Sequence, residues 1–266
     1  WVRQNVTGGP FASATPEEWM GDLPELCREL GDTPELVEAL LGAAWERLRD
    51  RLEQALSCPR AGQVRVTLVA LGVQLAALLK AASAAGAVLV LTSVVDRCAR
   101  DDLLDASVSA LENVPDELRG DSELRRLTDF VTGRLRDKLA IPPREADDWS
   151  IVPLSGCRCE LCARLGEFLA SPSAQTLEWP LPQPKRRHVH ARIDDAELPV
   201  THGTRRVGRP YVLVLTKTPA LFDREREGRG RSVRVLAALT ERREGLFKVD
   251  ARALRADIDD ILDPSL

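Results

Sequence analysis

Three cysteines lie within six residues of one another, and all three histidines of the chain follow within the next forty residues. They are Cys157, Cys159 and Cys162, then His188, His190 and His202. The two residues between Cys159 and Cys162 allow both thiolates to face one tetrahedral zinc ion, with Cys157 also within reach. A metal ion bound here would tie residues 157–202 together, so this spacing constrains the fold more than any other feature.

The sequence leaves open which histidine completes the site. One histidine would give a Cys3His set and two would give Cys2His2; either set is closed to water, so we expect a structural Zn2+. The alternative is three thiols without a metal, because cysteine is often a small buried apolar residue. Cys27, Cys58 and Cys98 stand singly in helix-like segments, and the sequence shows no recognisable signal peptide. We expect these cysteines to be reduced and the chain to be intracellular, in the cytoplasm.

The composition favours helices and gives the chain little net charge. Lys and Arg number 37 against 41 Asp and Glu, so attraction to nucleic acid or to a membrane has to be local. Ala, Leu and Arg are abundant and only 4% of residues are aromatic, which suits helices better than sheets. The chain opens at Trp1 and its one methionine is Met20, so we expect a piece of a longer protein.

Helical periodicity extends over the first half of the chain. A hydroxyl, a proline and an acid follow one another at Thr15-Pro16-Glu17 and again at Thr33-Pro34-Glu35, an order typical of helix starts. The second helix should end near Pro59. Two later helices are predicted, one from Asp101 to about Pro115 and one that begins at Asp121.

Residues 64–95 are almost continuously apolar. Lys80 divides this run into pieces shorter than the roughly 18 consecutive apolar residues of a membrane span. We therefore predict two central helices, apolar all round, that meet near Gly86 and have no contact with a membrane. Their apolar residues should pack against Leu40, Trp45, Leu104 and Phe130.

The second half changes character after two adjacent prolines at positions 142 and 143. A short helix is predicted to follow the cysteines, and another should run from Pro184 through His188 towards Ile193. Strand-forming residues predict a hairpin of residues 200–206 and 211–217. The alternating charges of residues 223–231 indicate a solvated turn before closing helices.

The predicted fold class is mainly α: a helical bundle or irregular α-solenoid followed by a small α+β zinc-binding module. The predicted divisions are a linker at 1–14, a helical domain at 15–140, a linker at 141–150, the zinc-binding module with its hairpin at 151–218, and C-terminal helices at 219–266.

Basic residues gather around the predicted zinc site. They are Lys185, Arg186, Arg187, Arg192, Arg205, Arg206 and Arg209. Such a local excess of positive charge would bind phosphates or an acidic protein in a salt-dependent way. Only Trp179 and Tyr211 lie near it in the sequence, which argues against base stacking. A solvated face without a partner is the alternative.

Catalytic patterns are poorly developed. A His-x-His pair at His188 and His190 could hold a catalytic metal if Asp194 or Asp195 completed the set. His202-Gly203-Thr204 matches only half of a two-histidine phosphoesterase pattern. The sequence contains no phosphate-binding glycine loop, nucleophile elbow or His-Glu-x-x-His motif, so we expect no catalytic activity in this chain.

Several short motifs in the second half of the sequence resemble those of a known group of proteins. They are Cys157-x-Cys159-x-x-Cys162, Phe168-Leu169, Arg187-x-x-His190, Thr201-His202-x-Thr204-x-Arg206 and Gly208-x-Pro210-Tyr211-x-Leu213-Val214-x-Thr216-Lys217. Residues 149–218 resemble the C-terminal zinc-finger-like region of large multidomain proteins, some of which carry an iron- and 2-oxoglutarate-dependent oxygenase domain. The Cys-x-Cys start is similar to a SWIM-type finger, although Cys162 follows sooner than in that pattern. The resemblance implies zinc binding and association with DNA or protein.

These features predict a non-catalytic interaction module, in which a helical scaffold carries a zinc-stabilised basic module that docks onto nucleic acid or an acidic protein. The alternative is a regulatory or accessory region of a larger enzyme whose catalytic domain lies outside this chain.

Overall fold

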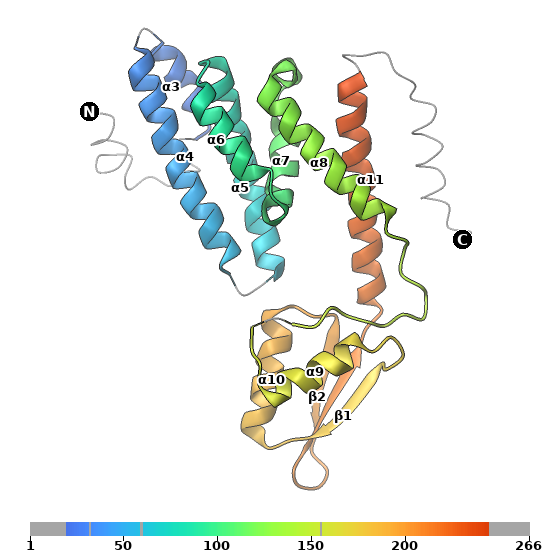
Figure 1. The fold of residues 1–266 in the computed structure, drawn as a ribbon. Coiled ribbons are helices and arrows are strands. Elements are labelled where there is room, and N and C mark those ends of the chain that lie inside the picture. The colour runs from blue at the N-terminus through green and yellow to red at the C-terminus, as the bar shows by residue number, and fades with distance from the viewer. Residues whose placement is uncertain (1–19, 32, 59–60, 155, 245–266) are drawn as a thin grey trace. The chain divides into compact units, whose positions relative to one another are not determined.

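The computed structural model describes residues 20–31, 33–58, 61–154 and 156–244. It is mostly helical, with one three-stranded antiparallel sheet, as Figure 1 shows. The chain divides into two compact units. Residues 141–231 form the body of the second unit, and helix α11 (Ala220–Glu244) contributes residues to both.

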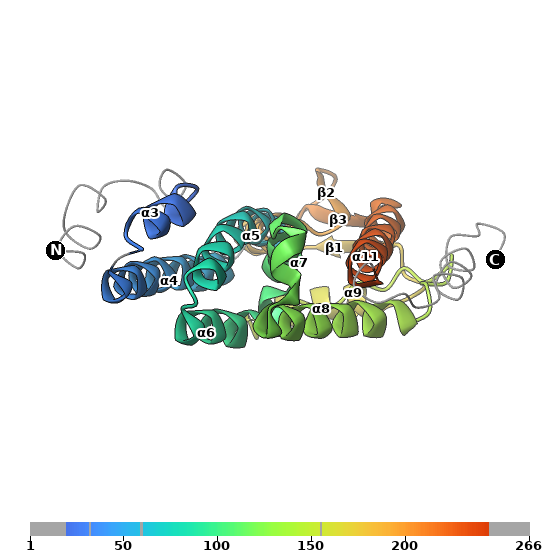
Figure 2. The same cartoon turned by 90° about the horizontal axis from the view of Figure 1, so that it is seen from above.

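The first unit is built from helices joined by short connections. They are α3 (Leu23–Glu29), α4 (Pro34–Leu56), α5 (Ala61–Ala84), α6 (Val88–Cys98), α7 (Leu104–Asn113) and α8 (Ser122–Ala140), with the 3-10 helices η2 (Asp101–Leu103) and η3 (Asp116–Gly120). Helix α6 contacts α4 on one side and α8 on the other. Figure 2 shows α6 and α8 in one row and α5 and α7 in a second. The predicted start at Thr15 lies outside the described residues.

The predicted helical hairpin of residues 64–95 is confirmed. Helices α5 and α6 meet at Gly86, whose φ of +64° favours a residue without a side chain. Leu40 and Trp45 are buried in the same core, and Leu104 and Phe130 pack against it. Trp45 also donates a hydrogen bond from Nε1 to Ser93 Oγ at 3.0 Å.

A second glycine allows α5 to approach α7 closely. A Cβ atom added at Gly72 would lie 2.5 Å from the carbonyl oxygen of Ala106 and 2.5 Å from Ser109 Cβ. Ser109 Oγ donates a 2.8 Å hydrogen bond to the carbonyl oxygen of Val69 across the same contact. Any side chain at position 72 would push these helices apart.

Helices α5 and α6 were predicted to be central helices buried on every side, but each has exposed apolar residues. Val66 on α5 is 71% exposed, and Leu89 on α6 is 76% exposed. By length and composition alone, residues 62–84 would suffice to cross a membrane, and 56% of the most apolar window is buried inside the protein. A core helix of a soluble protein meets the same criterion, so the absence of a membrane span stays a prediction.

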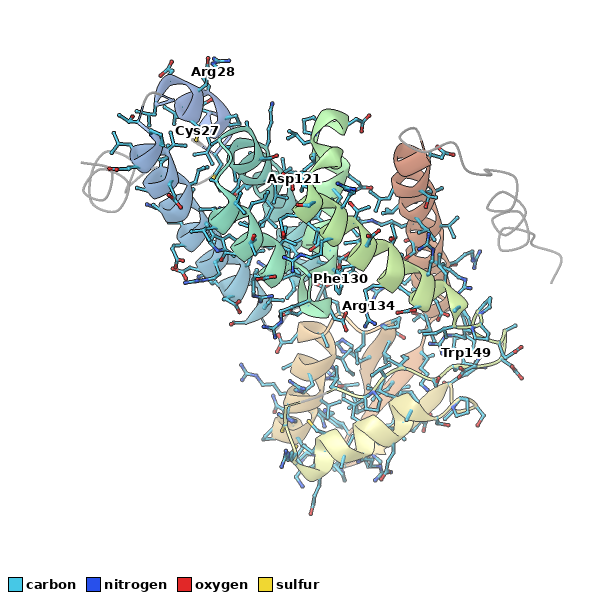
Figure 3. The ribbon with its side chains drawn as sticks, turned by 45° about the horizontal axis from the view of Figure 1, so that its top comes forward. Cys27, Arg28, Asp121, Phe130, Arg134 and Trp149 are labelled. Carbon is cyan, nitrogen blue, oxygen red and sulfur yellow. The ribbon has the colours of Figure 1, made fainter. Side chains whose placement is uncertain are left out.

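Asp121 fixes the start of α8, as predicted. Its Oδ1 accepts a 2.8 Å hydrogen bond from the backbone N–H of Glu123, in the manner of an N-cap. Its Oδ2 accepts a 3.0 Å hydrogen bond from Ser83 Oγ near the end of α5. Figure 3 labels Asp121 at this end of the helix. One carboxylate therefore caps α8 and joins it to α5.

The second unit contains a sheet of strands β1 (Thr176–Pro180), β2 (Val200–Arg205) and β3 (Val212–Lys217), in the order β1-β3-β2. The predicted β2–β3 hairpin is confirmed, with Thr201 opposite Thr216. Strand β1 was not predicted, because it is only five residues long and ends in proline, although less exposed and exposed residues alternate along it. It pairs with β3, which places Trp179 opposite Leu213.

Helices α9 (Glu160–Ala170) and α10 (Gln183–Asp195) pack against this sheet. Both helices were predicted. Their buried residues Leu165, Phe168, Val189 and Ile193 form a core with Leu213 and other apolar residues of the strands. This core positions α9 and α10, which carry the candidate metal ligands.

Lys217 at the end of β3 holds the C-terminus of α9. Its side chain is 3% exposed, and Nζ donates hydrogen bonds to the carbonyl oxygens of Leu169 at 3.0 Å and Ser171 at 2.7 Å. The ammonium group also lies 4.8 Å from the ring centroid of Phe168. Burial lowers the pKa of Lys217. A cation at this position satisfies carbonyl groups that a helix end leaves without partners.

Residues 141–150, predicted to be a linker, contain no helix or strand and lie in the second unit. There Arg144 binds Glu225 through Nε at 2.7 Å, and Trp149, labelled in Figure 3, stacks edge-on against Phe222. One prediction for the second half needs correction. The charged residues 223–231 form part of α11 and not a turn. Alternating charges also suit an exposed helix face, on which Arg226 pairs with Asp223 one turn away.

Candidate metal centre

Four predicted ligands come together at one point in the second unit. The sulfur atoms of Cys157, Cys159 and Cys162 and one ring nitrogen of His188 all lie within 4.8 Å of one another. His188 Nε2 is 3.3 Å from Cys162 Sγ, 3.4 Å from Cys159 Sγ and 3.9 Å from Cys157 Sγ. Such separations are compatible with four ligands around one small cation.

Local backbone structure explains why these side chains converge. Gly156 has a φ of +102°, which turns the chain immediately before Cys157. Cys159 is the N-cap of α9 and Cys162 lies in its first turn, so the helix start brings both sulfurs to the same side. His188 reaches the group from α10, which the core of the second unit packs beside α9.

The environment stabilises one thiolate and disfavours another. The backbone N–H of Cys162 and the thiol of Cys157 lower the pKa of Cys159 to about 6. Burial, together with hydrogen bonds that the Cys162 thiol donates to Cys157 and Cys159, raises the pKa of Cys162 to about 11. A bound divalent cation would reverse the second effect, because it deprotonates coordinating thiols.

The four donors form a Cys3His set. Three thiolates and one imidazole are typical of structural zinc, since all four tetrahedral positions come from the protein. Comparisons with protein-family models, curated proteins and solved structures found no match to this chain. The case for a metal centre therefore rests on the geometry of these four side chains.

The other two predicted histidines lie outside this group. His190 on α10 and His202 on β2 face each other, with ring centroids 4.6 Å apart. Because successive residues of a helix are about 100° apart, His188 and His190 point in opposite directions from α10. Of the three histidines that the sequence left open, His188 is the one that lies close to the three cysteines.

Two of the predicted basic side chains are engaged inside the protein. Arg186 donates through Nη1 to the carbonyl oxygen of Leu181, and its guanidinium carbon lies 5.4 Å from the ring centroid of Tyr211. Arg205 forms a two-pronged ion pair with Glu178 on β1, with 2.7 Å between Nη1 and Oε1. These contacts take Arg186 and Arg205 away from the predicted basic face. Arg192 is half-buried and also makes contacts within the protein.

The remaining four basic side chains are exposed. They are Lys185, Arg187, Arg206 and Arg209. Within the described ranges, none of them forms an ion pair with an acidic side chain. Lys185 and Arg187 lie on α10 beside the metal ligand His188, and Arg206 and Arg209 lie in the turn between β2 and β3.

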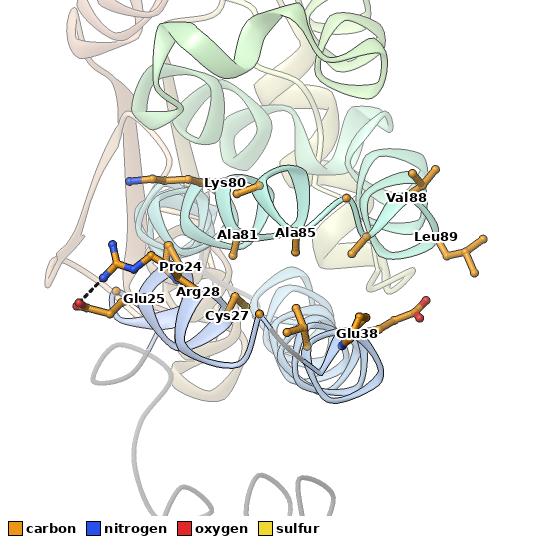
Figure 4. Close-up of a pocket in the computed structure, with 17 residues that line it drawn as sticks. Pro24, Glu25, Cys27, Arg28, Glu38, Lys80, Ala81, Ala85, Val88 and Leu89 are labelled. Carbon is orange, nitrogen blue, oxygen red and sulfur yellow. Dashed lines mark hydrogen bonds and ion pairs between the residues drawn. The ribbon is translucent and has the colours of Figure 1, made fainter.

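The first unit contains a cavity of about 990 Å³ between α3, α4 and α5, shown in Figure 4. Its lining is mostly small or apolar, as at Ala81 and Ala85, and two of its four charged residues, Glu25 and Arg28, pair with each other at 2.6 Å. Lys80 points along one side of it in Figure 4. Within the described residues, the one group of metal-binding geometry is the Cys3His set, so the cavity offers no competing centre.

Proposed function

We propose that this protein is a non-catalytic interaction module whose second unit is folded around a structural zinc ion. The convergence of Cys157, Cys159, Cys162 and His188 within 4.8 Å supports this proposal above all. A Cys3His set leaves no coordination position for a substrate, and catalytic zinc sites need an open position. The zinc ion would join the start of α9 to the middle of α10.

We further propose that the exposed cations of this unit bind a polyanion. Residues 141–231 carry fifteen Lys and Arg against twelve Asp and Glu, although acids outnumber bases in the whole chain. Lys185 and Arg187 are exposed and lie two residues apart on α10, close to His188 but on opposite sides of the helix. A zinc ion at His188 would hold this part of α10 in place and so fix the position of both charges.

The partner would be recognised through charge and not through base stacking. Trp179 is 5% exposed and belongs to the core of the second unit. The guanidinium group of Arg186 lies over one face of the Tyr211 ring, 5.4 Å from its centroid. Neither of these two rings is therefore a free platform for stacking of the kind that readers of single strands use. Contacts with phosphates or with carboxylates of an acidic protein remain.

Salt-dependent binding of the full-length chain tests this function. Zinc is quantified first, and binding to duplex DNA, single-stranded RNA and poly-glutamate is then measured at several salt concentrations. Replacing both Lys185 and Arg187 by Ala should lower affinity and reduce the slope of log K against log salt by up to about two for duplex DNA, since each phosphate contact contributes about 0.9.

The matched control replaces Arg136 and Lys138 on α8, which are also exposed and two residues apart. This control should bind as the parent does. Preference for RNA and DNA over poly-glutamate would identify a nucleic acid, and the reverse preference would identify an acidic protein. Absence of binding to all three at low salt, or equal effects of both double variants, would contradict the proposal.

A further inference from the structure

Cys159 and Cys162 form a Cys-x-x-Cys pair at the start of α9. Cys159 is the N-cap of this helix, and its carbonyl oxygen accepts a 3.0 Å hydrogen bond from the backbone N–H of Ala163. Cys162 lies within the turn that this bond closes. Reactive cysteines of thiol–disulfide proteins occur in the same motif and at helix starts. The pair therefore has the placement of a redox dithiol as well as that of two zinc ligands.

The three cysteines of the metal centre differ in exposure. Cys159 is exposed, whereas Cys157 and Cys162 are half-buried. Because susceptibility to oxidation follows exposure, a small oxidant in solution reaches the sulfur of Cys159 first. The three sulfur atoms lie within 4.8 Å of one another, so a second thiol is close enough to react with an oxidised Cys159. Cys162 shares the helix start with Cys159, whereas Cys157 precedes the helix.

We propose that Cys159 and Cys162 form a reversible disulfide when the protein meets a peroxide, and that this reaction releases the structural zinc ion. The release of zinc rests on the proposed function, whereas formation of the disulfide requires only the two cysteines. Disulfide sulfurs are not thiolates, so two ligands, Cys157 and His188, would remain for the metal. In reducing compartments, disulfides that form are usually transient and redox-sensing.

The reaction is an oxidation of two thiolates by one peroxide molecule. The Cys159 thiolate attacks one oxygen of hydrogen peroxide, the O–O bond breaks, and a sulfenic acid and one water form after protonation. The Cys162 thiolate then attacks this sulfur, the S–S bond forms, the S–O bond breaks, and the oxygen leaves as a second water. Both electrons that the sulfurs lose pass to the peroxide. Two molecules of a thiol such as glutathione reverse the reaction by exchange and leave as their own disulfide.

Oxidation would affect α10 as well as α9. The disulfide lies within the start of α9, whereas His188 belongs to α10. Loss of zinc would therefore remove the link between the two helices and free the part of α10 that carries Lys185 and Arg187. The affinity of the second unit for a polyanion should fall on oxidation and recover on reduction with added zinc.

Peptide mapping identifies the disulfide. The full chain, loaded with zinc, is treated with hydrogen peroxide, its remaining thiols are alkylated, and it is digested with trypsin without a reductant. Cleavage after Arg158 and after Arg164 separates Cys157 from the other two cysteines. A bond between Cys159 and Cys162 leaves peptide 159–164 unalkylated and lighter than its dithiol form by two hydrogen atoms. A bond to Cys157 would instead join two peptides. A metal-binding dye measures the released zinc in parallel.

We expect one zinc ion to be released for each disulfide that forms in peptide 159–164, and dithiothreitol with added zinc to restore the parent. Cys58→Ser is the matched control, because Cys58 is also half-buried but lies outside the metal-binding group. It should release zinc and form the disulfide as the parent does. Cys157→Ser should bind zinc more weakly and still form the disulfide, since Cys157 takes no part in it.

The possible failures are distinguishable. Zinc-loaded protein that forms no disulfide in peptide 159–164, or whose disulfide joins Cys157, would overturn this inference and leave the proposed function standing. Accumulation of sulfinic acid on Cys159 without a disulfide would overturn it as well. Purified protein that binds no zinc would contradict the proposed function, and the peptide map would still decide whether Cys159 and Cys162 form a disulfide.

Discussion

The two units of this protein are stabilised by different means. The first has a continuous core of 36 buried apolar residues within the described ranges, whereas the second has eleven. Small domains with little buried apolar surface often need a metal or another cross-link. In the second unit, Lys217 contacts the C-terminal end of α9, and four potential metal ligands come together near the N-terminal end of that helix. Polar contacts therefore contribute more to defining the fold of the second unit, where apolar burial is limited.

The largest difference in stability between the two units should appear when the proposed zinc ion is removed. We expect a chelator, or the change Cys162→Ser, to unfold residues 151–217, since metal binding to such sites is coupled to folding. The helices before Asp121 should stay folded because their core contains none of the four ligands. Amide hydrogen exchange resolved by peptide measures both regions in one experiment.

Cys58→Ser is the matched control, because Cys58 stands outside the metal-binding group. It should leave exchange in the second unit unchanged. If the second unit keeps its protection after complete removal of metal, its eleven-residue core is sufficient and the contrast between the units is smaller than we infer.

The complementary experiment destabilises the first unit by creating a cavity in its core. Leu75 on α5 is fully buried, and Leu75→Ala should destabilise this unit by about 2–5 kcal/mol. Val73→Ala on the same helix is the control, because Val73 is 51% exposed and should cost less than about 0.5 kcal/mol. Zinc content should stay the same in both variants. Loss of zinc in Leu75→Ala would show that the units unfold together.

Much of the first unit could be predicted from the sequence because helix signals are local. The Pro34 start of α4, the break at Gly86 and the cap at Asp121 each depend on a few adjacent residues. Strand β1 was missed because its partner β3 lies more than thirty residues away. Which face of α5 is exposed, as at Val66, depends on neighbours that periodicity alone does not identify.

The sequence identified the candidate metal ligands but not which of the three histidines lies beside the cysteines. Ligand spacing pointed to the three cysteines and three histidines, yet the choice of His188 required the position of α10 relative to α9. The pairing of Arg205 with Glu178 joins two strands that were not both predicted. Charge counts along the sequence therefore overestimated the basic face.

A smaller effect concerns the pH dependence of the first unit. Burial raises the pKa of Cys98, which is 1% exposed, from 9.0 to about 12. The folded state therefore keeps a proton that the unfolded state releases above pH 9, and stability falls as pH rises between 9 and 12. The slope is at most about 1.4 kcal/mol per pH unit for one proton.

Cys98→Ala should remove this part of the pH dependence. Unfolding of both proteins by urea at pH 8, 9 and 10 measures it, and the second unit serves as an internal reference. We expect the difference in unfolding free energy between parent and Cys98→Ala to be constant below pH 9 and to shrink above it. A constant difference up to pH 10 would mean that the folded unit releases the thiol proton as readily as the unfolded chain does.

The smallest effect on stability should come from the ion pair on the sheet of the second unit. Arg205 and Glu178 are about half exposed, at 49% and 50% of their side-chain surface. Solvent screens such pairs, and ordering two long side chains opposes their attraction. Arg205→Ala should therefore leave the thermal midpoint of the second unit nearly unchanged, even though Arg205 lowers the pKa of Glu178.

The same ion pair leads to a sharper prediction about polyanion binding. Glu178 neutralises Arg205, whereas the adjacent Arg206 is exposed and has no acidic partner within the described residues. Arg206→Ala should weaken polyanion binding more than Arg205→Ala does. Glu178→Ala should strengthen binding, because it frees Arg205 without adding a charge. Titrations of the three variants at one low salt concentration test this order, and a weaker affinity of Glu178→Ala would place the polyanion away from the sheet.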